Sequence, residues 1–138
     1  MKRATIIGVC FIFLIGMTGM AMAKTLKIGT MSPLTGPYAQ DGTDIKQGVM
    51  TAVEAFGAVE GFDKVEVMPG DSACDGGKAT MAANKLINSG ANVVIGAYCS
   101  SATEPAQIPL MEAKVVQITP ASTNERLTSK GYKYFFRM

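Results

Sequence analysis

The sequence has 138 residues, contains no histidine and no tryptophan, and is only 7% aromatic. Without histidine, neither a Ser-His-Asp nor a Cys-His catalytic arrangement can be built within this segment. Two cysteines follow the N-terminal segment, Cys74 and Cys99, and their spacing is not C-x-x-C, so the sequence gives no support to a zinc site. Hydroxyls, carboxylates and backbone groups are therefore the groups from which a functional site must be built.

Nucleotide and nucleic-acid motifs are also missing. The glycines at 29–36 in "GTMSPLTG" fit neither G-x-G-x-x-G nor a phosphate-binding loop that ends in Lys-Ser/Thr. The 13 basic and 11 acidic residues are mixed, and no basic patch with interleaved aromatics occurs. We therefore expect no cofactor and no nucleic-acid partner.

The first 23 residues have the features of a secretory signal peptide. Lys2 and Arg3 precede an apolar stretch from Ile6 to about Met17, and the segment ends in Ala-Met-Ala at 21–23. Removing residues 1–23 removes two basic residues and no acid, which leaves the mature part with equal numbers of both. We therefore predict export to the periplasm through a cleaved signal.

Two alternatives to a cleaved signal remain for this segment. A membrane anchor would need about 20 apolar residues, which is longer than this run. A lipoprotein signal would place its lipid on Cys10, but Cys10 lies early in the run and follows the bulky Val9. In an exported protein, Cys74 and Cys99 indicate a disulfide, with two buried thiols or a metal pair as the alternatives.

Apolar strands and amphipathic helices alternate after the signal segment. The hydrophobic patterns predict strands at 25–31, 63–71, 92–98, 115–119 and the start of one at 132–138. Helices are predicted at 43–59, 75–90 and 100–114, with loops at 32–42 and 120–131. This alternation indicates an α/β fold with a parallel sheet and helices on both faces.

Helix limits can also be predicted from local signals. The first helix should begin at a cap formed by Thr43 or Asp44 and place apolar residues on one face, namely Ile45, Val49, Val53 and Phe56. Gly90 should end the second helix, because glycine accepts the left-handed turn there. Ser101 and Glu104 have the spacing of a capping box, and Pro109 should distort the third helix.

Ligands of open parallel sheets bind beyond the carboxyl ends of the strands. Hydroxyl-bearing residues are frequent in the segments expected there, at 31–42, 71–75, 98–103 and 119–124. The helix start at 99–103 has free N–H groups and the hydroxyls of Ser100 and Ser101, which suit an anion such as a carboxylate. The loop "TPASTN" offers a backbone carbonyl and the hydroxyls of Ser122 and Thr123, which suit an ammonium.

An anion site beside an ammonium site would fit a zwitterion such as an amino acid. The alternative is that these hydroxyls only cap helices and turns. Asp71 and Asp75 likewise either form a carboxylate pair or, as we expect, cap a helix and solvate a loop.

Several segments of the sequence resemble a known family. The segments "KIGTMSPLTGPYAQDGTDIKQGVMTAV", "GDSACD", "VIGAYCSSATEPA" and "ITPASTNERLTSKGYKYFFRM" are similar, in order, to the periplasmic substrate-binding proteins of branched-chain amino-acid ABC transporters. The resemblance implies a type I fold of two α/β lobes with the ligand in the cleft between them. Residues 24–138 would be the N-terminal lobe of a longer protein, and the second lobe would not be contained in this sequence.

The resemblance also implies roles for individual residues. Ser100 would bind the ligand carboxylate through its hydroxyl and backbone N–H, Ala121 would offer its carbonyl to the ammonium, and Thr123 would add a hydroxyl. Tyr98 would border the pocket. The two cysteines of the mature part would be bridged.

One position departs from the family pattern. Asp41 stands where branched-chain binders often place an aromatic residue over the ligand side chain, which leaves the identity of the amino acid open. The resemblance further implies a monomer without enzymatic activity that delivers its ligand to an ABC permease. An exported amino-acid or amide sensor on the same scaffold is the alternative function, and an enzyme with a flavodoxin-like fold is a third.

Overall fold

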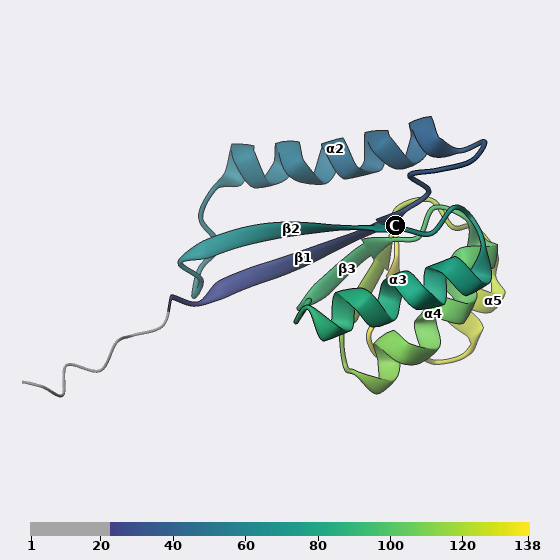
Figure 1. Cartoon of the computed structure of the whole chain (residues 1–138). Coiled ribbons are helices and arrows are strands. Elements are labelled where there is room, and N and C mark those ends of the chain that lie inside the picture. Colours follow the sequence, from purple (N-terminus) through teal and green to yellow (C-terminus); the bar gives the residue numbers. More distant parts are fainter. Residues whose placement is uncertain (1–22) are drawn as a thin grey trace, which may run out of the picture.

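The computed structural model describes residues 23–138, which form a five-stranded sheet with helices (Figure 1). The predicted signal peptide, up to residue 22, lies outside the described residues. The strands are β1 (Thr25–Ser32), β2 (Lys64–Asp71), β3 (Val93–Gly96), β4 (Val116–Thr119) and β5 (Phe135–Arg137). The helices are α2 (Ala39–Phe56), α3 (Gly76–Asn88), α4 (Ser100–Glu112) and α5 (Arg126–Ser129).

The sheet is entirely parallel, with strand order β2-β1-β3-β4-β5. Helix α2 covers one face, while α3 and α4 cover the other (Figure 1). This confirms the predicted parallel α/β architecture, including all five strands. The short helix α5 lies in the segment 120–131, which was predicted to be a loop. Within residues 23–138, no helix is long and apolar enough to cross a membrane.

The predicted start of α2 is wrong. The helix begins at Ala39, one turn before the expected cap, and Tyr38 at the N-cap makes no side-chain capping bond. Instead of capping, the Thr43 hydroxyl donates to the Ala39 carbonyl four residues earlier, inside the helix. The early start brings Gly42 against the loop that follows β1, where the Ser32 hydroxyl donates to the Gly42 carbonyl at 2.9 Å.

The capping box predicted for α4 is also wrong. Cys99 is the N-cap and no side chain caps this end. The Ser101 hydroxyl donates to the Cys74 carbonyl at 3.2 Å, and the Glu104 carboxylate pairs with Lys130. The helix continues through Pro109 and ends at Glu112, so the proline does not interrupt it.

The core lies between the sheet and the pair α3 and α4. Its buried residues combine a few large side chains with many alanines, namely Met31, Ala79, Ala83, Leu86, Val94, Ala102, Ala106 and Leu110. Small residues let the two helices approach the sheet and each other closely. On the opposite face, an apolar groove of about 620 Å³ runs between α2 and the strands. The predicted apolar face of α2 lines this groove, although Phe56 remains 82% exposed.

Candidate functional site

The loops after β1, β2, β3 and β4 meet at one edge of the sheet, because parallel strands all end on the same side. A disulfide between Cys74 and Cys99 joins two of these loops, with the two Cα atoms 5.3 Å apart. This confirms the predicted bridge. Ala73 and Cys74 have φ angles of 44° and 54°, so the chain makes a left-handed turn that presents Cys74 to Cys99.

Asp71 holds the loops after β1 and β2 together. Its carboxylate accepts hydrogen bonds from the Leu34 amide at 2.8 Å, the Thr35 hydroxyl at 2.6 Å and the Ala73 amide at 2.9 Å. Burial opposes the charged form, but these hydrogen bonds outweigh it and lower the pKa of Asp71 below its ordinary value. Asp75 caps α3 by accepting from the Lys78 amide. The two acids therefore serve a turn and a cap, as expected.

The amino end of α4 faces this edge of the sheet. The Cys99 carbonyl accepts from the amides of Ala102 and Thr103, which closes the first turn. Within residues 23–138, the backbone N–H groups of Ser100 and Ser101 have no acceptor. Such N–H groups, with the helix dipole behind them, favour an anion.

Ser122 anchors the loop that follows β4. The residue is only 1% exposed, and its hydroxyl lies 3.1 Å from the Ala97 carbonyl, 3.0 Å from the Tyr98 carbonyl and 2.6 Å from the Thr103 hydroxyl. The Thr119 hydroxyl also donates to the Ala97 carbonyl, at 2.6 Å. The Ser122 hydroxyl is thus engaged within the protein, and it holds the loop rather than pointing out of it.

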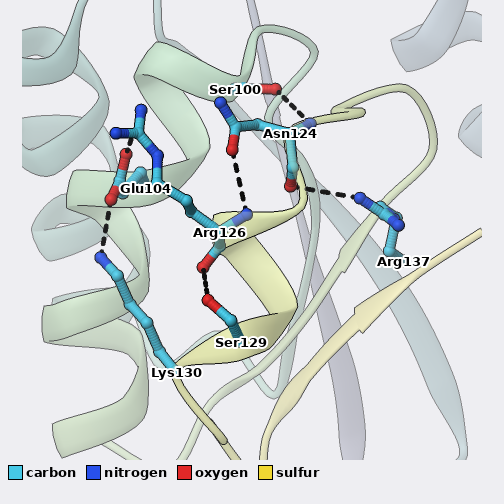
Figure 2. A network of polar contacts seen from close by, with 7 residues as sticks. All are labelled: Ser100, Glu104, Asn124, Arg126, Ser129, Lys130 and Arg137. Atoms are coloured by element: carbon cyan, nitrogen blue, oxygen red, sulfur yellow. Dashed lines mark hydrogen bonds and ion pairs between the residues drawn. The ribbon is translucent and has the colours of Figure 1, made fainter.

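A second network fixes the far end of this loop (Figure 2). The backbone N–H of Asn124 donates to the Ser100 hydroxyl at 3.2 Å, and the side-chain carbonyl of Asn124 accepts from the backbone N–H of Arg126 at 3.0 Å. Arg137, from β5, donates to the carbonyls of Thr123 and Asn124 at 3.0 and 3.2 Å. The loop from 120 to 125 is therefore held by α4 on one side and by β5 on the other.

Ion pairs tie α5 to α4 next to this network. The Glu104 carboxylate accepts from Lys130 at 2.8 Å and lies 3.9 Å from Arg126 (Figure 2). The hydrogen bond from Lys130 and its positive charge lower the pKa of Glu104. All three side chains reach solvent, so these pairs position α5 more than they stabilise the fold.

The groups predicted for ligand binding gather around this edge. Ala121 and Thr123 line a small cavity of about 270 Å³ together with Arg137. Across the residues that the structure describes, neither the Ala121 carbonyl nor the Thr123 hydroxyl has a hydrogen-bond partner. Tyr98 packs against Tyr38, with ring centroids 5.9 Å apart.

Besides Ser122, whose hydroxyl is buried, two more of the predicted residues are placed differently from this group. Asp41 is exposed in the first turn of α2, three residues after Tyr38. The Ser101 hydroxyl is directed to the carbonyl of Cys74, which leaves its backbone N–H as the group facing the site. The sequence reasoning missed Asn124 and Arg137, because no local pattern shows that β5 returns beside the loop after β4. Within the described part of the chain, no cluster of three or more metal-ligating side chains occurs.

Comparisons with known proteins match this geometry to one family. The family model for periplasmic binding proteins matches residues 25–138. A leucine-, isoleucine-, valine-, threonine- and alanine-binding protein of Pseudomonas aeruginosa is 39% identical over 117 residues, which cover 83% of this chain and 31% of the relative. The Leu/Ile/Val-binding protein of Escherichia coli K12 is 37% identical, covering 87% of this chain and 33% of the relative.

Solved structures give the same result. The branched-chain amino-acid binding protein LivJ of Streptococcus pneumoniae, in complex with isoleucine, has a TM-score of 0.73 and 30% identity, over 83% of this chain and 33% of that one. A solute-binding protein of Rhodopseudomonas palustris, in complex with 3,4-dihydroxybenzoic acid, has a TM-score of 0.75 and 28% identity, over 82% of this chain and 31% of that one. This chain spans about a third of the length of its curated relatives. The protein belongs to the periplasmic binding protein family.

Proposed function

We propose that this chain is part of a solute-binding protein that captures an amino acid outside the inner membrane for an ABC transporter. The observation that carries the proposal is that the amino end of α4 and the loop after β4 lie next to each other at the carboxyl end of the sheet. Backbone N–H groups without an acceptor and the Ser100 hydroxyl lie at the amino end of α4. The loop that carries Ala121 and Thr123 is joined to Ser100 by a hydrogen bond from the backbone N–H of Asn124. Groups for both charged ends of a zwitterion therefore lie side by side.

The carboxylate would bind at the start of α4. The backbone N–H groups of Ser100 and Ser101 are donors without an acceptor among the described residues, and the Ser100 hydroxyl can donate its own proton. The positive end of the helix dipole adds to the attraction. No side-chain cation is required, which suits a carboxylate that must also be released.

The ammonium would bind on the loop after β4. The Ala121 carbonyl and the Thr123 hydroxyl are both acceptors that no other described residue occupies. Tyr98, packed on Tyr38, would form the apolar wall beside the ligand side chain. Ser122 would serve the site indirectly, by anchoring the loop, and Asp41 would stand at the rim.

The relatives support this ligand class. Several carry names that state binding of leucine, isoleucine and valine, and one structural relative holds isoleucine. Others hold benzoic acids, which share only the carboxylate with an amino acid. A carboxylate site is what both classes of ligand require, and the ammonium site is what distinguishes an amino acid from an aromatic acid.

The wider assignment combines the sequence predictions with the family of the relatives. Residues 1–23 would be a cleaved signal peptide, and 24–138 the N-terminal lobe of a two-lobed, monomeric periplasmic protein. Closure of the lobes around the ligand would present a joint surface to the membrane permease. Binding without chemistry is the role, since solute-binding proteins are not enzymes.

Nuclear magnetic resonance (NMR) titration of the ¹⁵N-labelled 138-residue chain tests the proposal, because it detects millimolar binding. L-leucine should shift the amide signals of Ser100, Ser101, Ala121 and Thr123. Leucine methyl ester, which lacks the carboxylate, should lose the shifts at Ser100 and Ser101. N-acetyl-leucine, which lacks the ammonium, should lose those at Ala121 and Thr123. 4-Hydroxybenzoate serves as the aromatic comparison, and shifts confined to other regions would contradict the proposal.

A further inference from the structure

The peptide group between Thr123 and Asn124 is held from both of its edges. Its carbonyl accepts from Arg137 Nη1 at 3.0 Å, and its N–H donates to Ser100 Oγ at 3.2 Å. In a trans peptide these two groups point in opposite directions. Arg137 and Ser100 therefore contact opposite edges of one planar peptide group, and Figure 2 shows the two side chains on either side of Asn124.

Arg137 is itself fixed in place by the sheet. Its backbone pairs with Thr119 in the register of β4 and β5, and the Met138 amide donates to the Thr119 carbonyl at 3.2 Å. The same guanidinium nitrogen also donates to the Asn124 carbonyl at 3.2 Å. Two carbonyls on one nitrogen define the direction of the loop more narrowly than a single hydrogen bond would.

The hydrogen bonds of this peptide group determine which acceptor the Ser100 hydroxyl is free to donate to. A hydroxyl has one proton to donate and two lone pairs. Because the Asn124 N–H occupies a lone pair of Ser100 Oγ, the hydroxyl proton remains available for another acceptor. A cation on the carbonyl side of the same peptide polarises its N–H and strengthens the contact with Ser100.

We propose that Arg137 is a positioning residue for the ligand site. Through the peptide group that joins Thr123 to Asn124, it sets the direction in which the Ser100 hydroxyl donates its proton to a ligand carboxylate. The second part rests on the function proposed above, whereas the coupling between Arg137 and Ser100 is a property of the ligand-free chain. Arg137 acts on Ser100 through the loop, although it also lines the small cavity with Ala121 and Thr123.

The first experiment needs no ligand. It compares the 138-residue chain with Arg137→Met, Arg137→Lys and Lys133→Met, the last of which removes an exposed cation from the same segment. Hydrogen exchange of the Asn124 amide and the side-chain coupling constants of Ser100 are measured by NMR, with the Val94 amide as the reference for global opening. Arg137→Met should raise Asn124 exchange about tenfold, the low end for a hydrogen bond to a charged group, and should average the Ser100 side-chain rotamers.

Arg137→Lys should restore part of both effects, and Lys133→Met should change neither. If Arg137→Met leaves Asn124 exchange and the Ser100 rotamer as in the unsubstituted chain, the inference is wrong whatever the ligand does. A rise in exchange at Val94 equal to that at Asn124 would also overturn it, because the effect would then be a general loss of stability.

The second experiment titrates the same variants with L-leucine. If the unsubstituted chain shows leucine shifts at Ser100, Arg137→Met should weaken leucine binding about tenfold, the equilibrium counterpart of the same hydrogen bond. Equal affinity in both chains would overturn the positioning role. If leucine shifts are confined to residues away from this edge, the proposed function fails, while the first experiment still decides the coupling.

Discussion

Gly42 and Gly48 both lie in α2, and the structure predicts opposite effects for the same substitution at the two positions. A Cβ atom added to Gly42 would overlap the backbone carbonyl of Pro33, in the loop after β1. Nothing lies within 4 Å of a Cβ added to Gly48. The pair therefore isolates tertiary contact from helix propensity.

The magnitudes follow from two terms. Alanine is favoured over glycine inside a helix by about 0.8–1 kcal/mol, and this gain applies to both positions. At Gly42, overpacking costs about 1–3 kcal/mol, and backbone atoms place the cost at the upper end because they cannot rotate away. Gly42→Ala should thus lower the free energy of unfolding by about 2 kcal/mol, whereas Gly48→Ala should raise it by about 0.5–1 kcal/mol.

Urea unfolding followed by circular dichroism measures both variants against the unsubstituted chain. Equal slopes of the unfolding free energy against urea concentration would show that all three chains expose the same surface area on unfolding. The unfolding midpoints can then be compared as measures of stability. A Gly42→Ala chain that is as stable as the Gly48→Ala chain would refute the account of how α2 meets the first loop. The same end of α2 follows Tyr38, whose ring lies 5.9 Å from that of Tyr98.

Other predictions concern the disulfide, pH and affinity. Replacing both Cys74 and Cys99 by alanine should lower the free energy of unfolding by about 3.5 kcal/mol, the entropy estimate for a loop of this length; a loss below about 1 kcal/mol in thermal unfolding would contradict it. The lowered pKa of Asp71 stabilises the folded chain above the ordinary carboxyl pKa, and this contribution is lost as pH falls through the folded value. Asp71→Asn should therefore unfold more easily than the unsubstituted chain at neutral pH and approach it in acid, and a gap in unfolding midpoints that stays constant down to about pH 2 would argue against this role. If residues 24–138 are one lobe of a two-lobed protein, as proposed above, they cannot close over a ligand by themselves. Calorimetry of the 138-residue chain with leucine, valine and alanine should then show weak or undetectable binding, and tight binding would refute the need for a second lobe.

Much of the fold could be predicted because it depends on local patterns. The continuous apolar strand at 92–98 and the alternation of Val65 and Val67 predicted buried and half-buried strands, which the structure confirms within a few residues. The parallel arrangement followed from helices between successive strands. Each of these signals is carried by neighbouring residues, so one sequence suffices to detect it.

The two wrong helix caps have a common cause, which is a contact with residues outside the helix. The start of α2 depends on a contact between Gly42 and the loop after β1, and the local caps at Thr43 and Asp44 carry no trace of it. The capping box at Ser101 failed because its serine and its glutamate have partners far away in the sequence, Cys74 and Lys130. Tertiary contacts overrode a valid local signal in both cases.

The candidate site was predicted in outline but not in its support. Ser100 and the loop at 119–124 lie together as expected, and the Asn124 amide joins them. Arg137 could not be predicted, since its role arises only when β5 pairs with β4 and passes beside that loop. Ser122 illustrates the converse, because its burial redirects a hydroxyl expected at the ligand to the carbonyls of Ala97 and Tyr98.

The central claim is that one edge of the sheet holds both charged ends of an amino acid, and a crystal structure of this chain grown at saturating L-leucine tests it most directly. The account predicts the carboxylate within hydrogen-bond distance of the Ser100 hydroxyl and backbone N–H, and the ammonium against the Ala121 carbonyl and the Thr123 hydroxyl. Leucine bound elsewhere, with the Ser100 hydroxyl contacting only Asn124 and the Thr123 hydroxyl contacting only solvent, would contradict it.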